Sequence, residues 1–212
     1  MLTVRGLTCE RNERVLFRDL NVELAAGGLL RIRGPNGSGK TTLLRILCGL
    51  FEDFTGEVEW ADDTRFVFAG HRPGVNGALS AAENLAFLVG LAGDATGSRV
   101  VDQALAAVGL AGYEDTPASA LSEGQRKRVN LARLAFVSPR APVANRASIG
   151  GDDAAGPDVW VLDEPLASLD ADGVHWVERQ IGAHLDAGGA VLFTSHQDLQ
   201  GRLPSQTLDL GL

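Results

Sequence analysis

The sequence is poor in positive charge, cysteine and long apolar runs, and each shortage excludes a class of protein. Its 212 residues carry 19 Lys and Arg against 27 Asp and Glu, so the formal net charge of -8 argues against a general electrostatic grip on nucleic acid. Cys9 and Cys48 match no disulfide framework or metal-binding spacing, so we expect reduced thiols. The longest apolar run, residues 85–91, is far shorter than the about 18 residues of a spanning helix. We therefore expect a soluble protein, and the strand-like residues 1–5 leave no room for a signal peptide.

A glycine-rich segment between an apolar strand and a helix carries the first chemical signal. Residues 29–33 alternate at a period of two, and residues 41–47 place apolar side chains at helical spacing. Between them, residues 34–41 match the pattern G-x-x-x-x-G-K-[ST], whose backbone N–H groups face phosphate oxygens. We expect Lys40 to reach the β- and γ-phosphates of a nucleotide and the Thr41 hydroxyl to bind Mg²⁺. The predicted nucleotide-binding residues here are Gly34, Pro35, Asn36, Gly37, Ser38, Gly39, Lys40, Thr41 and Thr42.

Three further short apolar runs predict strands that are buried on both faces of a largely parallel sheet. They are residues 66–68, 159–162 and 190–193, and they are rich in β-branched and aromatic side chains. Residues 73–137 instead have a helical pattern. Ser80 and Ser122 are predicted N-caps there, each followed three residues later by Glu or Gln. We therefore expect a helical lobe inserted into an α/β core.

A segment without periodicity follows that lobe. Residues 138–157 are rich in Pro, Gly and small side chains, and unstructured connections of this length are uncommon in compact domains. We interpret the segment as a mobile surface loop. A tolerated insertion is favoured over a docking element, and both interpretations stay open.

The strand at residues 159–162 runs directly into two carboxylates. Asp163 and Glu164 would lie at the carboxyl edge of the sheet, where open α/β folds bind their ligands. We expect Asp163 to hold Mg²⁺ through water or the Thr41 hydroxyl, and Glu164 to orient and polarise an attacking water. Many strands end in a solvated acid, so this pattern alone is weak, and the phosphate loop upstream strengthens it.

Further segments resemble the motifs of ATP-binding cassette (ABC) ATPases. Residues 121–125 resemble the LSGGQ signature, with Glu123 in place of the first glycine. In that family the signature contacts the γ-phosphate of ATP held by the other subunit, so the resemblance implies a homodimer with ATP sandwiched between the chains. Residues 194–196 resemble the switch segment, which implies that His196 lies near the γ-phosphate and holds Glu164 and water in line. The signature and D-loop residues implied are Leu121, Ser122, Glu123, Gly124, Gln125, Ser168, Leu169 and Asp170.

Two positions depart from the family pattern. Arg72 stands in Gly-His-Arg-Pro-Gly, where the family has a glutamine that contacts Mg²⁺ and the lytic water. A fixed cation beside Mg²⁺ should be repelled, so we expect Arg72 to turn toward the γ-phosphate or away, and hydrolysis to slow. Residues 9–14 hold no aromatic to stack on adenine. Arg11 is the candidate for stacking on the base, and an ordinary surface arginine is the alternative.

Softer matches narrow the resemblance to one branch of the family. Residues 7–17, 70–74, 83–85 and 109–115 resemble CcmA, the ATPase subunits of cytochrome c maturation (haem exporter) complexes. This implies translocase-coupled hydrolysis of MgATP, linked to release of a haem-loaded chaperone or to haem export. The chain would bind integral membrane subunits from the cytoplasmic face of the inner membrane, or from the matrix side in mitochondria, with only indirect membrane contact and no nucleic acid.

Two other functions stay open at this point. Membrane partners choose the cargo, so the chain could be an ABC ATPase for another substrate. Arg72 also leaves room for an ATP-gated assembly clamp that hardly turns over.

The resemblance also implies the fold class, a RecA-like P-loop NTPase α/β core with an inserted α-helical signature subdomain. We expect a single ABC ATPase domain, with the core at about 1–70 and 157–212, the helical subdomain at about 71–137 and the loop insertion at about 138–157.

The remaining charged and imidazole side chains have weaker patterns. Residues 126–128 and Arg133 form a basic cluster on the predicted signature helix, which we interpret as a solvated helix face rather than an anion-binding site. His175 and His184 are expected to be ordinary helix residues, and no pattern supports a role for His71.

Overall fold

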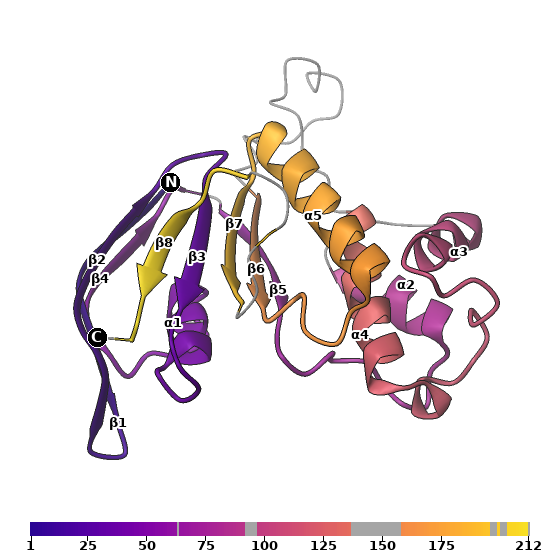
Figure 1. Cartoon of the computed structure of the whole chain (residues 1–212), viewed down its shortest axis with the longest axis horizontal. Coiled ribbons are helices and arrows are strands. Elements are labelled where there is room, and N and C mark those ends of the chain that lie inside the picture. The colour runs from indigo at the N-terminus through magenta and orange to yellow at the C-terminus, as the bar shows by residue number, and fades with distance from the viewer. Residues whose placement is uncertain (63, 92–96, 137–157, 196–198, 200–202, 212) are drawn as a thin grey trace.

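A central sheet of five parallel strands organises the molecule (Figure 1). The computed structural model describes residues 1–62, 64–91, 97–136, 158–195, 199 and 203–211. In the described residues the strand order is β5-β6-β7-β3-β8, and each neighbouring pair runs parallel. The strands are β3 (Leu29–Arg33), β5 (Arg65–Ala69), β6 (Asp158–Asp163), β7 (Ala190–Thr194) and β8 (Gln206–Asp209). The strands predicted from short apolar runs are therefore confirmed.

An antiparallel sheet of order β2-β1-β4 lies to one side of the central sheet (Figure 1). Its strands are β1 (Leu2–Arg11), β2 (Arg14–Leu24) and β4 (Thr55–Trp60). Helix α1 (Lys40–Leu47) buries Leu43, Leu44 and Ile46 in one core together with apolar side chains of this sheet. Helix α1 and the antiparallel sheet thus cover one face of the central sheet together.

The opposite face of the central sheet packs against helices. Along β6, Val159 and Val161 join the core around α1, whereas Trp160 and Leu162 join a second core with the helices. This alternation follows the period of two of a strand buried on both faces. The helices of the second core are α2 (Ala81–Leu91), α3 (Ser98–Ala107), α4 (Glu123–Ala132) and α5 (Ala171–Asp186).

Helices α2, α3 and α4 gather at the far side from the antiparallel sheet (Figure 1). Reciprocal capping boxes lie at the N-termini of two of these helices, α2 and α4. Ser80 and Glu83 exchange bonds of 2.8 and 3.2 Å at α2, and Ser122 and Gln125 exchange bonds of 2.9 and 3.2 Å at α4. Both predicted N-caps are confirmed. Short 3₁₀ turns at Ala118–Ala120 and Arg133–Ala135 flank α4.

The structure also shows where the cysteine and two of the histidine side chains lie. Cys9 and Cys48 are free thiols, and burial raises the pKa of Cys48 to about 12. His175 and His184 both lie in α5, where the buried His184 ring stacks on Trp160 with centroids 4.0 Å apart.

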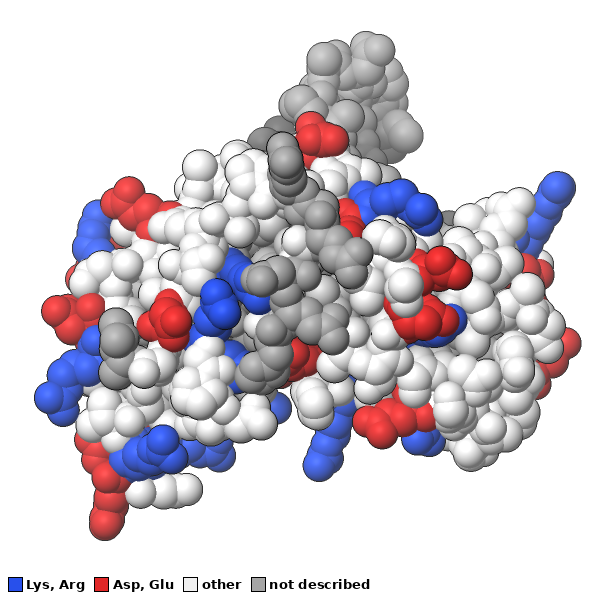
Figure 2. Space-filling view, viewed as in Figure 1, with Lys and Arg blue, Asp and Glu red and all other residues white. Residues whose placement is uncertain are grey.

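Figure 2 shows acidic and basic side chains interspersed over the face that it draws. Among the described residues, no helix is long and apolar enough to cross a membrane. Residues 138–157, the expected surface loop, lie outside the described residues.

Candidate functional site

The phosphate-loop segment connects the carboxyl end of a central strand to the start of a helix. β3 ends at Arg33, and α1 begins at Lys40. Gly39 caps α1 with φ +97°, a left-handed conformation that glycine adopts without steric cost. No side chain caps this helix, and its first turn holds no acidic residue. The N–H groups at the start of α1 therefore suit an anion, because among the described residues no side chain caps them and no acid in the first turn neutralises them.

Lys40 and Ser38 add polar groups to this loop. The Lys40 ammonium donates to the carbonyl oxygens of Gly34 and Pro35 at 2.8 and 3.1 Å, so its side chain folds back along the loop. The Ser38 hydroxyl is buried and has no hydrogen-bond partner among the described residues. A fixed cation beside unsatisfied donors is the chemistry that a phosphate group requires.

A buried carboxylate at the end of β6 faces this loop. Asp163 is 2% exposed, and one of its oxygens accepts a bond of 2.7 Å from the Thr41 hydroxyl at the start of α1. Its other oxygen accepts a bond of 2.7 Å from the Thr194 hydroxyl at the end of β7. Hydroxyl and carboxylate oxygens are the ligands that Mg²⁺ prefers, usually completed by water and substrate phosphates. Thr41 and Asp163 therefore fit a magnesium ion that arrives with a nucleotide.

Glu164 follows with an unusual backbone. Its φ of +53° lies in the left-handed region, which is costly for a residue with a side chain. Its N–H donates to the Thr194 hydroxyl at 2.8 Å, and its carbonyl oxygen accepts a bond from the Lys127 ammonium. Thr194 therefore holds the backbone of Glu164 and the carboxylate of Asp163 at once.

These groups surround one cavity of about 610 Å³. Two of its lining residues come from the antiparallel sheet. Arg11 is at the end of β1, with its guanidinium 5.9 Å from the centroid of the Phe51 ring, and Leu16 is on β2. The other lining residues are Asn36, Gly37, Gly39, Lys40, Thr41, Thr42, His71, Asp163, Glu164 and Ala167. The structure thus brings together predicted residues from the phosphate loop, the end of β6 and β1.

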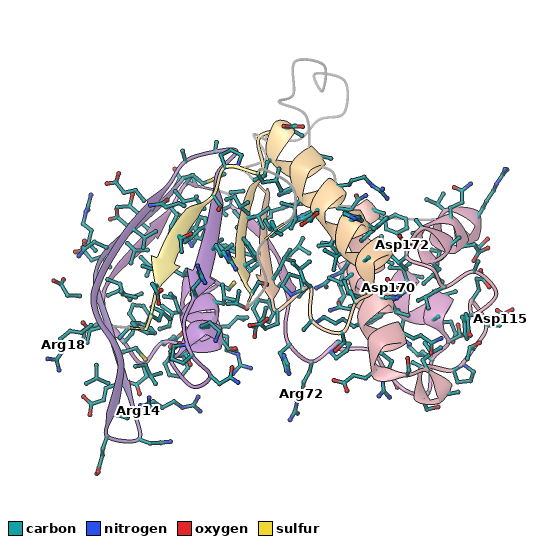
Figure 3. The ribbon with its side chains drawn as sticks, in the orientation of Figure 1. Arg14, Arg18, Arg72, Asp115, Asp170 and Asp172 are labelled. Atoms are coloured by element: carbon teal, nitrogen blue, oxygen red, sulfur yellow. The ribbon has the colours of Figure 1, made fainter. Side chains whose placement is uncertain are left out.

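Arg72 takes one of the two orientations expected for it, whereas His71, to which no role was assigned, lies at the cavity. Arg72 is exposed, does not line the cavity, and points away from the sheet and the helices (Figure 3). Its neighbour His71 does line the cavity. His71 and Leu16 were not predicted at the site, because a motif gives a position along the chain and not the direction in which a side chain points.

The predicted signature residues lie apart from this cavity, against the predicted D-loop of the same chain. A Cβ on Gly124 would lie 3.2 Å from the carbonyl oxygen of Ser168, so the two segments pack closely. Asp170 caps α5 through the N–H of Gly173 at 2.9 Å and accepts a bond of 2.7 Å from Arg128. These two donors hold the pKa of Asp170 below its usual value. Residues 121–125 and 168–170 do not line the cavity.

The basic cluster on α4 is not a solvated face, and that interpretation is wrong. Lys127 is 8% exposed and donates to the carbonyl oxygen of Glu164. Arg128 pairs with Asp170, and Arg133 donates to the carbonyl oxygen of Phe68 while burial lowers its pKa to about 10. The physical reason is that α4 and the turn after it pack against the core and α5, where buried carbonyl oxygens need donors.

His196 is one of the predicted catalytic residues, and it lies outside the described residues. Ser195, the preceding residue, is described and is buried at the end of β7.

Comparisons with known proteins agree with this geometry. The sequence profile of the ABC transporter family matches residues 17–143. Cytochrome c biogenesis ATP-binding export proteins CcmA are similar over nearly the whole chain. The protein from Pseudomonas syringae is 40% identical, covering 99% of this chain and 94% of its own length. Those from Aromatoleum aromaticum and Yersinia pseudotuberculosis are 41% and 43% identical, covering 99% and 94% of this chain and 95% and 87% of their own lengths.

Solved structures show the same fold. An ATP-binding cassette in a dimeric post-hydrolysis state, bound to ADP and phosphate, superposes with a TM-score of 0.73 at 21% identity, covering 100% of this chain and 94% of that one. The ATP-binding subunit of an ABC transporter superposes with a TM-score of 0.70 at 18% identity, covering 92% and 79%. The expected fold class, a P-loop NTPase, is confirmed.

Proposed function

Because the chain belongs to the ABC transporter family, and within it to the CcmA ATP-binding proteins, we propose that it is the MgATP-hydrolysing subunit of a membrane complex in cytochrome c maturation. The observation that carries this proposal is the single cavity that joins the phosphate loop to Asp163 and Glu164. A phosphate-binding loop, oxygen ligands for Mg²⁺ and a carboxylate base are the parts that phosphoryl transfer to water requires.

The polar groups around the cavity have proposed tasks. The backbone N–H groups of the phosphate loop and of the first turn of α1, together with the Lys40 ammonium, bind the phosphates. Thr41 and Asp163 hold Mg²⁺, which neutralises charge on the β- and γ-phosphates when it is bound. Glu164 orients the attacking water and accepts its proton. Arg11, which lines the cavity and lies over the Phe51 ring, stacks on the base of the nucleotide in this proposal.

The signature requires a second chain. Ser122, Gly124 and Gln125 form the start of α4 and lie outside the cavity of their own chain, so they are available to a nucleotide on another copy. We therefore propose a head-to-tail homodimer in which each ATP lies between the phosphate loop of one chain and the signature of the other. A similar ATP-binding cassette is a dimer bound to ADP and phosphate.

The cellular role follows from the relatives. Their printed name, cytochrome c biogenesis ATP-binding export protein, supports a chain that works with integral membrane subunits. We propose a peripheral protein on the cytoplasmic side of the cell membrane, or on the matrix side in mitochondria, whose hydrolysis drives release of a haem-loaded chaperone or haem export. Co-purification from native membranes tests this role. Recovery of cytochrome-maturation subunits supports it, and recovery of a different transporter's subunits would replace it with transport of another substrate.

The positions of His71 and Arg72 lead to a prediction on the rate. We propose that His71, which lines the same cavity as Glu164, takes over the contact with the lytic water that the family gives to a glutamine, because an imidazole can hydrogen-bond to water as an amide does. His71→Ala should lower kcat for ATP roughly tenfold, whereas Arg72→Gln should change it less than about twofold. Steady-state phosphate release measures both. A large rise in rate for Arg72→Gln would mean that Arg72 does slow hydrolysis, as an assembly clamp requires.

A further inference from the structure

The backbone of Glu164 is held in its left-handed conformation from two sides. Thr194, at the end of β7, accepts the Glu164 N–H at 2.8 Å. Lys127, on α4, donates its ammonium to the Glu164 carbonyl oxygen. A strained conformation of this kind persists only where its surroundings impose it. The direction of the Glu164 side chain therefore depends on one group from the central sheet and one from the helical lobe.

Burying the Lys127 ammonium to donate a hydrogen bond to a carbonyl oxygen costs free energy. Its side chain is 8% exposed, and burial lowers its pKa, while the charges of Glu164, Asp163 and Glu123 oppose that change. An apolar residue would pack in such a place without the cost of burying a charge. An apolar side chain could not donate this hydrogen bond. The bond from the Lys127 ammonium fixes the distance between α4 and the backbone of Glu164.

Helix α4 and the turn after it also contact two other segments. Arg128 binds Asp170, the N-cap of α5, at 2.7 Å, and Figure 3 shows Asp170 beside α4 and the start of α5. Arg133, just after α4, donates to the carbonyl oxygen of Phe68, near the end of β5 and shortly before His71. A displacement of α4 against the core would therefore reach Glu164 directly, through Lys127.

We propose that Lys127 is a positioning residue that ties the signature helix α4 to the backbone of Glu164, so that Glu164 faces the attacking water only while α4 keeps this place against the core. The proposal rests on the proposed role of Glu164 as the proton acceptor. In the head-to-tail dimer, the start of α4 faces the ATP of the partner chain. Lys127 then links the ATP engaged by the signature at one site to the glutamate that acts at the other.

The test compares variants of Lys127 in steady-state phosphate release, with the protein in complex with its membrane subunits. Lys127→Met should lower kcat about tenfold and leave the KM for ATP within about twofold, because Glu164 is misplaced while the phosphate loop is intact. Lys127→Arg keeps a cationic donor and should retain most of the rate. Arg126→Met is the matched control, since it removes a neighbouring cation of α4 that is less buried, and its kcat should stay near wild type.

A double-mutant cycle separates positioning from general stability. If Lys127 acts through Glu164, adding Lys127→Met to Glu164→Gln should lower the residual rate by less than about twofold. Additive losses would overturn the proposal. So would a Lys127→Met protein with unchanged kcat, a parallel loss of ATP affinity, or a Lys127→Arg protein as slow as Lys127→Met. If Lys127→Met does not fold, Lys127→Gln is tested in its place with the same expected outcomes. The Gln side chain is shorter than Lys and neutral, so this variant also lacks the ammonium.

The proposed function fails separately. That failure would appear as equal rates for the wild type and Glu164→Gln, whatever Lys127→Met does.

Discussion

Glu164→Gln should lower the steady-state rate of ATP hydrolysis by about a hundredfold or more and leave ATP bound. The amide has the size of the carboxylate and cannot accept the proton of the attacking water. The residue lies at the edge of the cavity, and the backbone bonds from Thr194 and Lys127 do not involve its side chain. The fold and the phosphate contacts should therefore survive the substitution.

Phosphate release measures the rate of this variant, and equilibrium binding of ATP measures its affinity. Asp172→Asn is the matched control, because it neutralises an exposed carboxylate in the first turn of α5, outside the cavity (Figure 3). A near wild-type rate for Glu164→Gln would remove Glu164 from the mechanism. An ATP-bound dimer that persists in this variant would support its assigned role.

Lys40→Ala should weaken ATP binding and hydrolysis together. Lys40 is the buried cation of the phosphate loop, held against the carbonyl oxygens of Gly34 and Pro35. Charge-assisted bonds to phosphate oxygens act in the ground state and in the transition state, so losing them should weaken ATP binding at least about tenfold. Calorimetry measures the affinity, with Arg45→Ala, an exposed cation in the last turn of α1, as the control. An unchanged affinity would contradict the proposed contact.

The local motifs were predictable from the sequence because each depends on a few neighbouring residues. The strand, loop and helix around Lys40 follow from periodicity and glycine spacing, and the position of Asp163 follows from the apolar run before it. The capping boxes at Ser80 and Ser122 are local in the same sense. Such features need no knowledge of which distant segments meet.

The features that were missed depend on contacts between distant segments. The bond from Lys127 to Glu164 joins residues that are 37 positions apart, so the charge pattern of α4 could not reveal it. Of the antiparallel sheet only the strand-like residues 1–5, at the start of β1, were predicted, and the rest was missed for another reason. Pairing of β1 with β2 shifts register between Val4 and Leu7 and again before and after Cys9, which breaks the alternation by which strands are recognised.

The central claim is that each ATP site is built from two chains. Its most direct test is to mix two variants that are each inactive alone and to measure phosphate release. Lys40→Ala disables the phosphate loop and spares the signature. Ser122→Asp keeps an N-cap on α4 and places a negative charge where the γ-phosphate of the partner chain would lie. In a mixed dimer, the phosphate loop of the second protein meets the intact signature of the first, which restores one of two sites. Random pairing should then recover about a quarter of the wild-type rate of phosphate release. A mixture no more active than its two components would show that the site does not form between chains.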